Sequence, residues 1–149
     1  MKISAGLLPY RRASGLEVLI AHPGGPFFAR RDVGFWSVVK GEVRVGEDLL
    51  EAARREFAEE TGWPAPGGPF HPLGTITQRG GKQVTAWGLE GDYDPQRLEP
   101  GTFDMRWRGR VRSFPEIDRV TWAAPALAAE LLNPAQAPLV ERLTELLSG

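Results

Sequence analysis

The stretch from Gly41 to Trp63, GEVRVGEDLLEAARREFAEETGW, constrains the fold of this chain more than any other. Alanine, arginine and glutamate fill its middle and favour a helix. Asp48, with Glu51 three residues later, resembles a capping box in which aspartate takes the usual place of serine or threonine. Gly62 stands where a C-terminal cap is expected, and Pro64 prevents continuation. We therefore predict a short loop that leads into one helix between Asp48 and Gly62.

Three glutamates gather on one side of this predicted helix. At about 100° per residue, Glu56, Glu59 and Glu60 fall within an arc of roughly 100°, beside an apolar stripe. Like charges at this spacing destabilise a helix slightly, and Arg55 can offset this by pairing with Glu51 or Glu59. A hard divalent cation would offset it more strongly, because Mg²⁺ takes oxygen ligands. The alternative is a solvated acidic face of the helix.

The order of the residues favours the cation. The stretch has five residues between Gly41 and Glu47, seven residues between Glu47 and Arg55, and glycine-tryptophan at its end. Its fixed and apolar members are Gly41, Glu47, Arg55, Glu56, Phe57, Glu59, Glu60, Gly62 and Trp63. This pattern resembles the Nudix box without a departure at any fixed position, so the chain resembles the Nudix hydrolase superfamily.

The resemblance implies a role for each charged member of the box. Glu56 and Glu60 would be direct metal ligands, and Glu59 would be a further ligand or the general base. Arg55 would orient a carboxylate, and Glu47 would hold the loop and the helix together. The cofactor would be Mg²⁺ or Mn²⁺.

The resemblance also assigns the residues around the helix. Gly41 and Gly62 would be conformational. The carbonyl of Lys40 would join the metal ligands, and its ammonium group could meet a phosphate or remain solvated. Many relatives have proline before this Lys-Gly pair. Here the residue is Val39, a departure that should alter loop stiffness more than chemistry.

Some Nudix enzymes take their catalytic base from outside the box. Three acidic residues are candidates here: Glu116, Glu99 and Asp104. Glu116 comes just before the last predicted strand, where some relatives carry a functional glutamate. The alternative for each is an ordinary surface carboxylate.

The rest of the chain reads as strands and two C-terminal helices. We expect strands over 2–12, 16–21, 35–39, 73–79, 82–89, 105–111 and 119–122, and helices over 126–132 and 137–147. Gly80-Gly81 predicts a hairpin turn. One helix between strands and two at the end fit an α/β class with a mixed sheet between helices. The resemblance implies the same fold, a Nudix-type α/β/α sandwich, as a single domain over residues 1–149.

Composition limits the other classes of function. The chain has no cysteine, so thiolate chemistry is impossible, and its only histidines, His22 and His71, argue against a zinc site. A formal net charge of −1 gives no case for a nucleic-acid surface, so nucleic acid is an improbable partner. No apolar run approaches the length of a membrane span. We expect a cytoplasmic monomer or homodimer without membrane attachment.

The implied reaction is metal-dependent pyrophosphohydrolysis. Water would attack one phosphorus of a nucleoside diphosphate linked to another group, without a covalent enzyme intermediate. Lys40, Lys82 and Arg79 are the candidate ligands of the remaining phosphates, and the Lys40-Gly41 pair together with a basic hairpin resembles members that act on diadenosine polyphosphates. Nucleoside triphosphates and nucleotide sugars stay open as substrates. A noncatalytic nucleotide-binding module is the alternative class, although such members usually lose a box carboxylate, and none is lost here.

Overall fold

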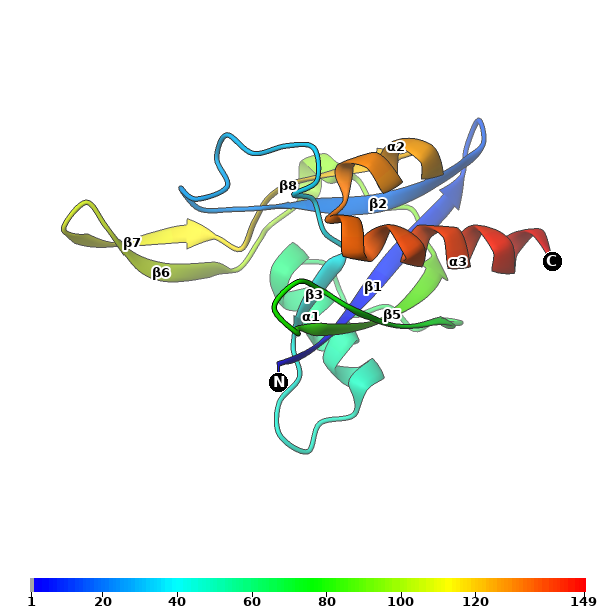
Figure 1. The fold of residues 1–149 in the computed structure, drawn as a ribbon, viewed down its shortest axis with the longest axis horizontal. Coiled ribbons are helices and arrows are strands. Elements are labelled where there is room, and N and C mark those ends of the chain that lie inside the picture. The colour runs from blue at the N-terminus through cyan, green and yellow to red at the C-terminus, as the bar shows by residue number, and fades with distance from the viewer. Residues whose placement is uncertain (1) are drawn as a thin grey trace.

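A computed structural model describes residues 2–149 and has a mixed β-sheet at its centre (Figure 1). The strands of this sheet are β1 (Ile3–Arg12), β2 (Leu16–Pro23), β3 (Val39–Glu42), β4 (His71–Thr77), β5 (Gln83–Glu90) and β8 (Ile117–Ala123). Within the described residues their order is β4–β5–β1–β2–β8, and β3 pairs with β1 off this path.

Strand β1 is the centre of the sheet, and two strands share one of its edges. On the other edge, β5 pairs parallel with β1 along nearly its whole length. On the shared edge, β3 pairs antiparallel with Ser4 to Leu7, whereas β2 pairs antiparallel with Tyr10 to Arg12. The sheet therefore splits along β1, because β2 and β3 cannot occupy the same part of its edge.

The apolar residues of β1 alternate between two hydrophobic cores. Ala5 and Leu7 pack in the core that includes helix α1 (Leu49–Thr61), whereas Leu8 and Tyr10 pack in the core beneath α2 (Pro125–Leu131) and α3 (Ala137–Ser148). A period of two is expected of a strand buried on both faces. Helices α1 and α3 lie on opposite sides of the sheet (Figure 1). The predicted α/β/α sandwich is confirmed.

Most of the predicted elements are present within a residue or two of their expected bounds. All three helices form, and the Gly80-Gly81 hairpin joins β4 to β5, with the Gln78 N–H donating to the Lys82 carbonyl at 2.7 Å. Short 3₁₀ turns occur at η1 (Pro95–Arg97) and η2 (Pro134–Gln136). None of the helices in residues 2–149 is both long and apolar enough to cross a membrane.

The strand expected over 35–39 is only partly present. Trp36 and Ser37 make isolated bridges to Leu132 and Ala21, and a regular strand begins only at Val39. Consecutive residues here pair with different elements, so no continuous ladder can form. The β-favouring side chains of this stretch did not reveal that change of partner.

The single strand expected over residues 105–111 is wrong. The chain instead forms a separate two-stranded hairpin from β6 (Thr102–Trp107) and β7 (Arg110–Pro115). The chain reverses at Arg108 and Gly109, whose φ angles are 53° and 78°. Both central residues therefore have positive φ, the requirement of a tight hairpin turn, and an arginine in such a place is an unusual signal.

Candidate active site

Helix α1 carries most of the predicted site, and its ends match the expected caps. Asp48 accepts a hydrogen bond from the Glu51 N–H at 3.1 Å. Gly62 has a φ of 77°, and its N–H donates to the Ala58 carbonyl at 2.9 Å. The reciprocal half of the capping box is absent from the described contacts, because the Glu51 side chain pairs with Arg54 at 2.9 Å instead.

The buried face of α1 decides where its glutamates lie. Ala53 and Phe57 are fully buried in the core on this side of the sheet. Glu56 and Glu60 lie beside this stripe, and the Glu56 side chain is only 15% exposed. Glu59 lies farther out, with a side chain that is 52% exposed. All three line one cavity, so the helix presents its carboxylates toward a common space.

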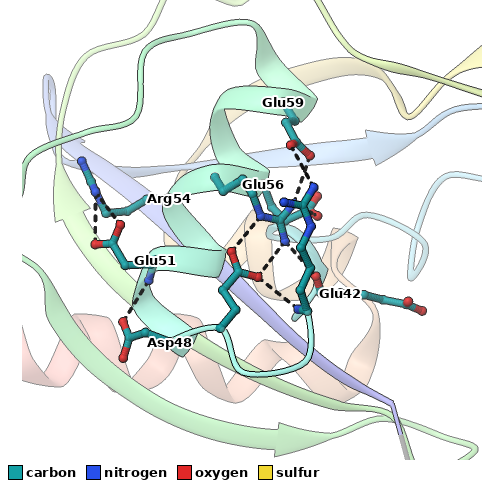
Figure 2. A network of polar contacts seen from close by, with 9 residues as sticks. Glu42, Asp48, Glu51, Arg54, Glu56 and Glu59 are labelled. Atoms are coloured by element: carbon teal, nitrogen blue, oxygen red, sulfur yellow. Dashed lines mark hydrogen bonds and ion pairs between the residues drawn. The ribbon is translucent and has the colours of Figure 1, made fainter.

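Arg55 holds the carboxylates of the loop and the helix together (Figure 2). Its guanidinium donates to both oxygens of Glu47, at 2.8 and 3.0 Å. It also donates to Glu56 at 2.7 Å, to Glu59 at 3.1 Å and to the Glu42 carbonyl at 3.1 Å. The expected pairing with Glu59 is present, and Glu51 pairs with Arg54 instead. Arg55 thus fixes the positions of two cavity glutamates through one planar group.

The Glu47 carboxylate also closes the loop that precedes the helix. It accepts a hydrogen bond from the Arg44 N–H at 3.0 Å in addition to its two bonds with Arg55. The Arg55 hydrogen bonds, followed by the Arg44 N–H, lower the pKa of Glu47 to about 2. This geometry supports the linking role that the motif implies for Glu47.

We predict that Glu47→Gln lowers stability at neutral pH and removes part of the acid sensitivity. The folded pKa lies below the ordinary value of 4.5, so Glu47 contributes stability above pH 4.5, and this contribution is lost as the pH falls toward 2. The difference in urea midpoint between wild type and variant should therefore shrink across that window. Glu51→Gln is the control, because its pair with Arg54 is exposed and should contribute little. A constant difference at every pH would contradict this account.

Gly41 provides space for a carboxylate. A Cβ atom at this position would lie 2.0 Å from Glu56 Oε2 and 2.0 Å from Glu56 Cδ. The φ angle of Gly41 is not positive, whereas Gly62 has the left-handed backbone conformation. The two glycines of the motif therefore act for different reasons, one through close approach and the other through backbone conformation.

Glu60 is the most unusual carboxylate of the site. Its Oε2 atom is buried and has no hydrogen-bond partner within residues 2–149. Burial, followed by the nearby charges of Glu56 and Glu116, raises the pKa of Glu60 to about 8, against the opposing charge of Lys40. Burial and Glu56 also raise the pKa of Glu116. The site therefore places like charges together in a poorly solvated place.

These residues share a cavity of about 1050 Å³ that opens where β2 and β3 separate. Its walls come from both of those strands, from α1, and from segments far away in the sequence. Five glutamates are among the residues that line it: Glu42, Glu56, Glu59, Glu60 and Glu116. Glu116 lies 56 residues after Glu60 in the sequence, and the turn that precedes β8 brings it to the same cavity.

The donors present fit a hard divalent cation, although the described residues contain no group of three that already closes around an ion. Carboxylate oxygens are the ligands that Mg²⁺ and Mn²⁺ prefer. Glu60 has a buried oxygen without a hydrogen-bond partner in residues 2–149. Gly41 has no side chain, and the Glu56 carboxylate occupies the space that a Cβ atom would fill. A cation would relieve the repulsion between these groups. The assignment of Glu56, Glu59, Glu60 and the Lys40 carbonyl as ligands stays a prediction.

The three basic residues expected to bind phosphate are divided between two places. Lys40 and Lys82 line the cavity, and burial together with the charge of Lys82 lowers the pKa of Lys40. Arg79 does not line that cavity; it belongs to an open hollow at the β4–β5 turn, which also includes Lys82. Lys40 and Lys82 are thus placed to contact the same ligand. Arg79 could contact only a part of that ligand that extends out of the cavity.

Of the three candidate bases outside the box, the structure brings one to the cavity. Glu116 lines it, whereas Glu99 packs beside Gly62 and donates its N–H to the Thr61 carbonyl. Asp104 lies on β6 and accepts a hydrogen bond from Ser113 at 2.6 Å. Position alone therefore favours Glu116, and its catalytic role stays a prediction.

The sequence did not reveal the polar wall of the cavity. Gln136 is 1% exposed, accepts from the Val38 N–H at 2.8 Å and donates to Gln78 at 2.7 Å. Phe28 and Phe35 line the cavity from the loop after β2. These residues are separated by up to about a hundred positions, so no local pattern connects them. His22 is fully buried, and its Nδ1 lies 2.9 Å from Asp118 Oδ1.

Comparisons with known proteins bear on the family and the fold of the chain. The NUDIX domain family model matches residues 2–143. An RNA pyrophosphohydrolase from Rhodospirillum rubrum is 28% identical over an alignment that covers 99% of this chain and 92% of that protein. A Caenorhabditis elegans Ap4A hydrolase in a binary complex has a similar fold, with a TM-score of 0.71, 23% identity, and coverage of 100% of this chain and 99% of that one.

A third comparison gives a similar fold. The NUDIX domain of Shewanella oneidensis NrtR, complexed with ADP ribose, has a TM-score of 0.67 and 17% identity, and covers 97% of this chain and 87% of that one. The match of the family model spans the box, the sheet and most of α3. The chain therefore belongs to the Nudix hydrolase family.

Proposed function

We propose that this chain is a single-domain, divalent-metal-dependent pyrophosphohydrolase that cleaves a phosphoanhydride bond in a nucleoside diphosphate linked to another group. The observation that carries the proposal is Glu60, whose buried oxygen has no hydrogen-bond partner within residues 2–149 while four other glutamates line the same cavity. A nucleotide-binding module would not need such a set. Nudix hydrolases generally use a divalent metal, and these residues fit one.

The proposed division of labour follows from the geometry. Glu56, Glu59 and Glu60, with the Lys40 carbonyl, would hold Mg²⁺ or Mn²⁺, which supplies charge stabilisation at a phosphoryl oxygen. Arg55 keeps Glu56 and Glu59 in place. The ammonium groups of Lys40 and Lys82 bind the phosphates that are not attacked.

The reaction itself needs a proton acceptor near the attacked phosphorus. The oxygen of a water forms the new P–O bond, the bridging oxygen leaves with its electron pair, and a carboxylate takes the water's proton. Glu116 and Glu59 are the candidates for this base. Burial and the charge of Glu56 raise the pKa of Glu116, and a raised pKa makes its carboxylate a stronger proton acceptor.

For the substrate, diadenosine polyphosphates are our first candidate among small molecules. Two lysines line one cavity with two phenylalanines, an arrangement that suits several phosphates and a stacked base. Nucleoside triphosphates and nucleotide sugars fit the same description with fewer contacts. The second candidate class is RNA, which the relative from Rhodospirillum rubrum favours because the alignment covers almost the whole chain.

The test is a substrate panel with Mg²⁺, with Mn²⁺ and with EDTA. We expect phosphate or nucleotide release from at least one of diadenosine polyphosphates, nucleoside triphosphates, ADP-ribose, nucleotide sugars or 5′-triphosphorylated RNA. EDTA should abolish the release, and added Mg²⁺ should restore it. A ligand that raises the melting temperature without any turnover would contradict the enzyme and favour a binding module.

A further inference from the structure

The β6–β7 hairpin projects away from the rest of the molecule. Within the described residues its two strands pair only with each other, and Figure 1 shows them as an arm at one end of the fold. Its outer half is solvated: Arg106, Arg108, Arg110, Val111 and Arg112 are all exposed. We call residues 102–115 the arm. Its strands contribute nothing to either core of the sandwich, so stability of the fold does not explain them.

The arm concentrates positive charge that the chain as a whole does not have. It carries four arginines and one aspartate, a formal charge of +3, in a chain whose formal net charge is −1. The aspartate, Asp104, is at the inner half, where it bonds with Ser113. The charged side chains of the outer half are therefore all arginines. A cationic projection on an acidic molecule is complementary to a polyanion.

The register of the hairpin places aromatic and cationic side chains on one face. Directly opposed residues share a face in an antiparallel pair, and the pairs on this face are Trp107–Arg110, Met105–Arg112 and Phe103–Phe114. At the tip the Arg108 guanidinium lies 5.7 Å from the Trp107 ring centre. This mixture of flat rings and guanidinium groups is the chemistry that binds the bases and backbone of a single strand.

The turn of the arm supports a role for its arginine. Arg108 has a φ of 53°, a conformation that favours glycine or asparagine over a residue with a long side chain. Nothing within the described contacts of the turn requires an arginine for folding, since its ring contact is with the neighbouring Trp107. A charged residue is thus kept where the backbone would prefer another.

The base of the arm is continuous with the cavity. Gly101 and Thr102, which lead into β6, line the cavity, as does Glu116 just after β7. Gly24 and Gly25 pack directly on this base, because a Cβ at either would meet Pro115 or Phe103 within 3 Å. A chain that leaves the carboxylate end of the cavity on this side therefore passes onto the arm.

The loop after β2 adds exposed aromatic rings near the same exit. Phe27 is 62% exposed and Phe35 is 37% exposed, and the Arg31 guanidinium lies 5.2 and 5.1 Å from their ring centres. Phe35 also lines the cavity. The loop thus repeats the pairing of aromatic rings with arginine that the arm presents.

We propose that the arm binds single-stranded RNA whose 5′ polyphosphate end occupies the cavity. Arg110 and Arg112 would contact phosphates, and Trp107 would stack on a base. A strand of six residues spans about 20 Å, enough for several nucleotides beyond the cavity. The proposal rests on the proposed pyrophosphohydrolase function and names its substrate class. It also revises the argument from net charge, because a balanced total conceals a segregated cationic surface.

The test compares RNA with a short substrate in the same variants. The arm variants are Trp107→Ala and Arg110→Gln with Arg112→Gln; Arg108→Asn removes a charge while suiting the turn. Arg12→Gln is the control for loss of charge, since Arg12 ends β1, whose β1–β2 turn lies at the opposite end of the molecule from the arm (Figure 1). Binding of a 5′-triphosphorylated oligoribonucleotide is measured by fluorescence anisotropy over a range of salt, alongside kcat/KM for that RNA and for a diadenosine polyphosphate.

We expect the double arginine variant to bind RNA at least about tenfold more weakly, with a log–log salt slope reduced by about 0.7 for each lost phosphate contact. Trp107→Ala should lose about fivefold or more, and Arg12→Gln should resemble wild type. Turnover of the diadenosine polyphosphate, if wild type shows any, should be unchanged in every arm variant. The melting temperature of Arg108→Asn should be equal to or above that of wild type while its RNA affinity falls.

Unchanged RNA affinity in the arm variants would overturn the proposal, as would a dimer that forms through the arm and dissociates in Trp107→Ala. Absence of turnover in wild type, together with RNA binding that depends on the arm, would reject the hydrolase function and leave the binding surface supported. The two failures are therefore distinguishable.

Discussion

Replacing Glu60 by glutamine should reduce turnover by about 10²- to 10³-fold or more and leave the fold intact. The substitution keeps the shape of the side chain, and no hydrogen bond to Oε2 is lost, because that atom has no partner within residues 2–149. The pKa of Glu60, raised to about 8, keeps most of this carboxyl group protonated at neutral pH, so glutamine replaces one neutral group by another and the folded state should not be weakened. What it does remove is a carboxyl group that can ionise in the proposed metal set.

The measurement combines kcat under saturating Mg²⁺ with thermal unfolding and metal titration followed by calorimetry. Glu51→Gln is the matched control, since Glu51 lies on the same helix but its exposed carboxylate pairs with Arg54 away from the cavity. The control should keep wild-type turnover. An unfolded Glu60→Gln protein, or one with wild-type turnover, would show that the role assigned to Glu60 is wrong.

Replacing Gly41 by alanine should reduce turnover by about 10²-fold with little change in stability. The new Cβ would lie 2.0 Å from Glu56 Oε2, but the atoms it meets are the end of a flexible side chain that can rotate away. The rotation would take Glu56 from its 2.7 Å contact with Arg55 and from its place in the cavity. Gly41 has no positive φ, so backbone strain should not add to the effect.

Gly67→Ala is the control for the general effect of removing a glycine. Gly67 also lacks a positive φ, and a Cβ there would meet no atom within 4 Å. Both variants restrict the unfolded chain equally, so Gly67→Ala should unfold at or slightly above the wild-type temperature. Gly41→Ala should unfold close to it, because the same gain is offset by the lost contact between Glu56 and Arg55. Only Gly41→Ala should lose activity. Equal activity in the two variants would mean that the position of Glu56 against Gly41 has no part in the reaction.

The helix of the site was predictable because its determinants are local. Its caps, its apolar stripe and the spacing of Glu56 and Glu60 all lie within a few turns of one another, and side chains at such separations are placed by helix geometry alone. The box pattern added the assignment of a family. The alternation of apolar residues along β1 was likewise local, and the layers of the sandwich follow from it.

The hairpin arm was missed for the opposite reason. Residues 105–111 alternate like one strand, and only the backbone conformation at Arg108 and Gly109 shows that the chain reverses there. The same holds for charge. The formal net charge of −1 suggested a surface unsuited to nucleic acid, whereas the arm has a formal charge of +3 and the rest of the chain balances it. The net charge of a sequence does not show where on the surface the positive and negative side chains lie.

The sequence by itself determined the family, the α/β/α class and the identity of the carboxylates on α1, since these depend on short-range order and periodicity. The tertiary structure alone decided that Glu116 joins them, that Glu99 and Asp104 do not, and that Lys82 accompanies Lys40 while Arg79 lies outside. It also created the cavity, because β2 and β3 share an edge of β1 and must separate. Contacts between residues far apart in the chain depend on how strands pair, and strand pairing is a property of the whole fold.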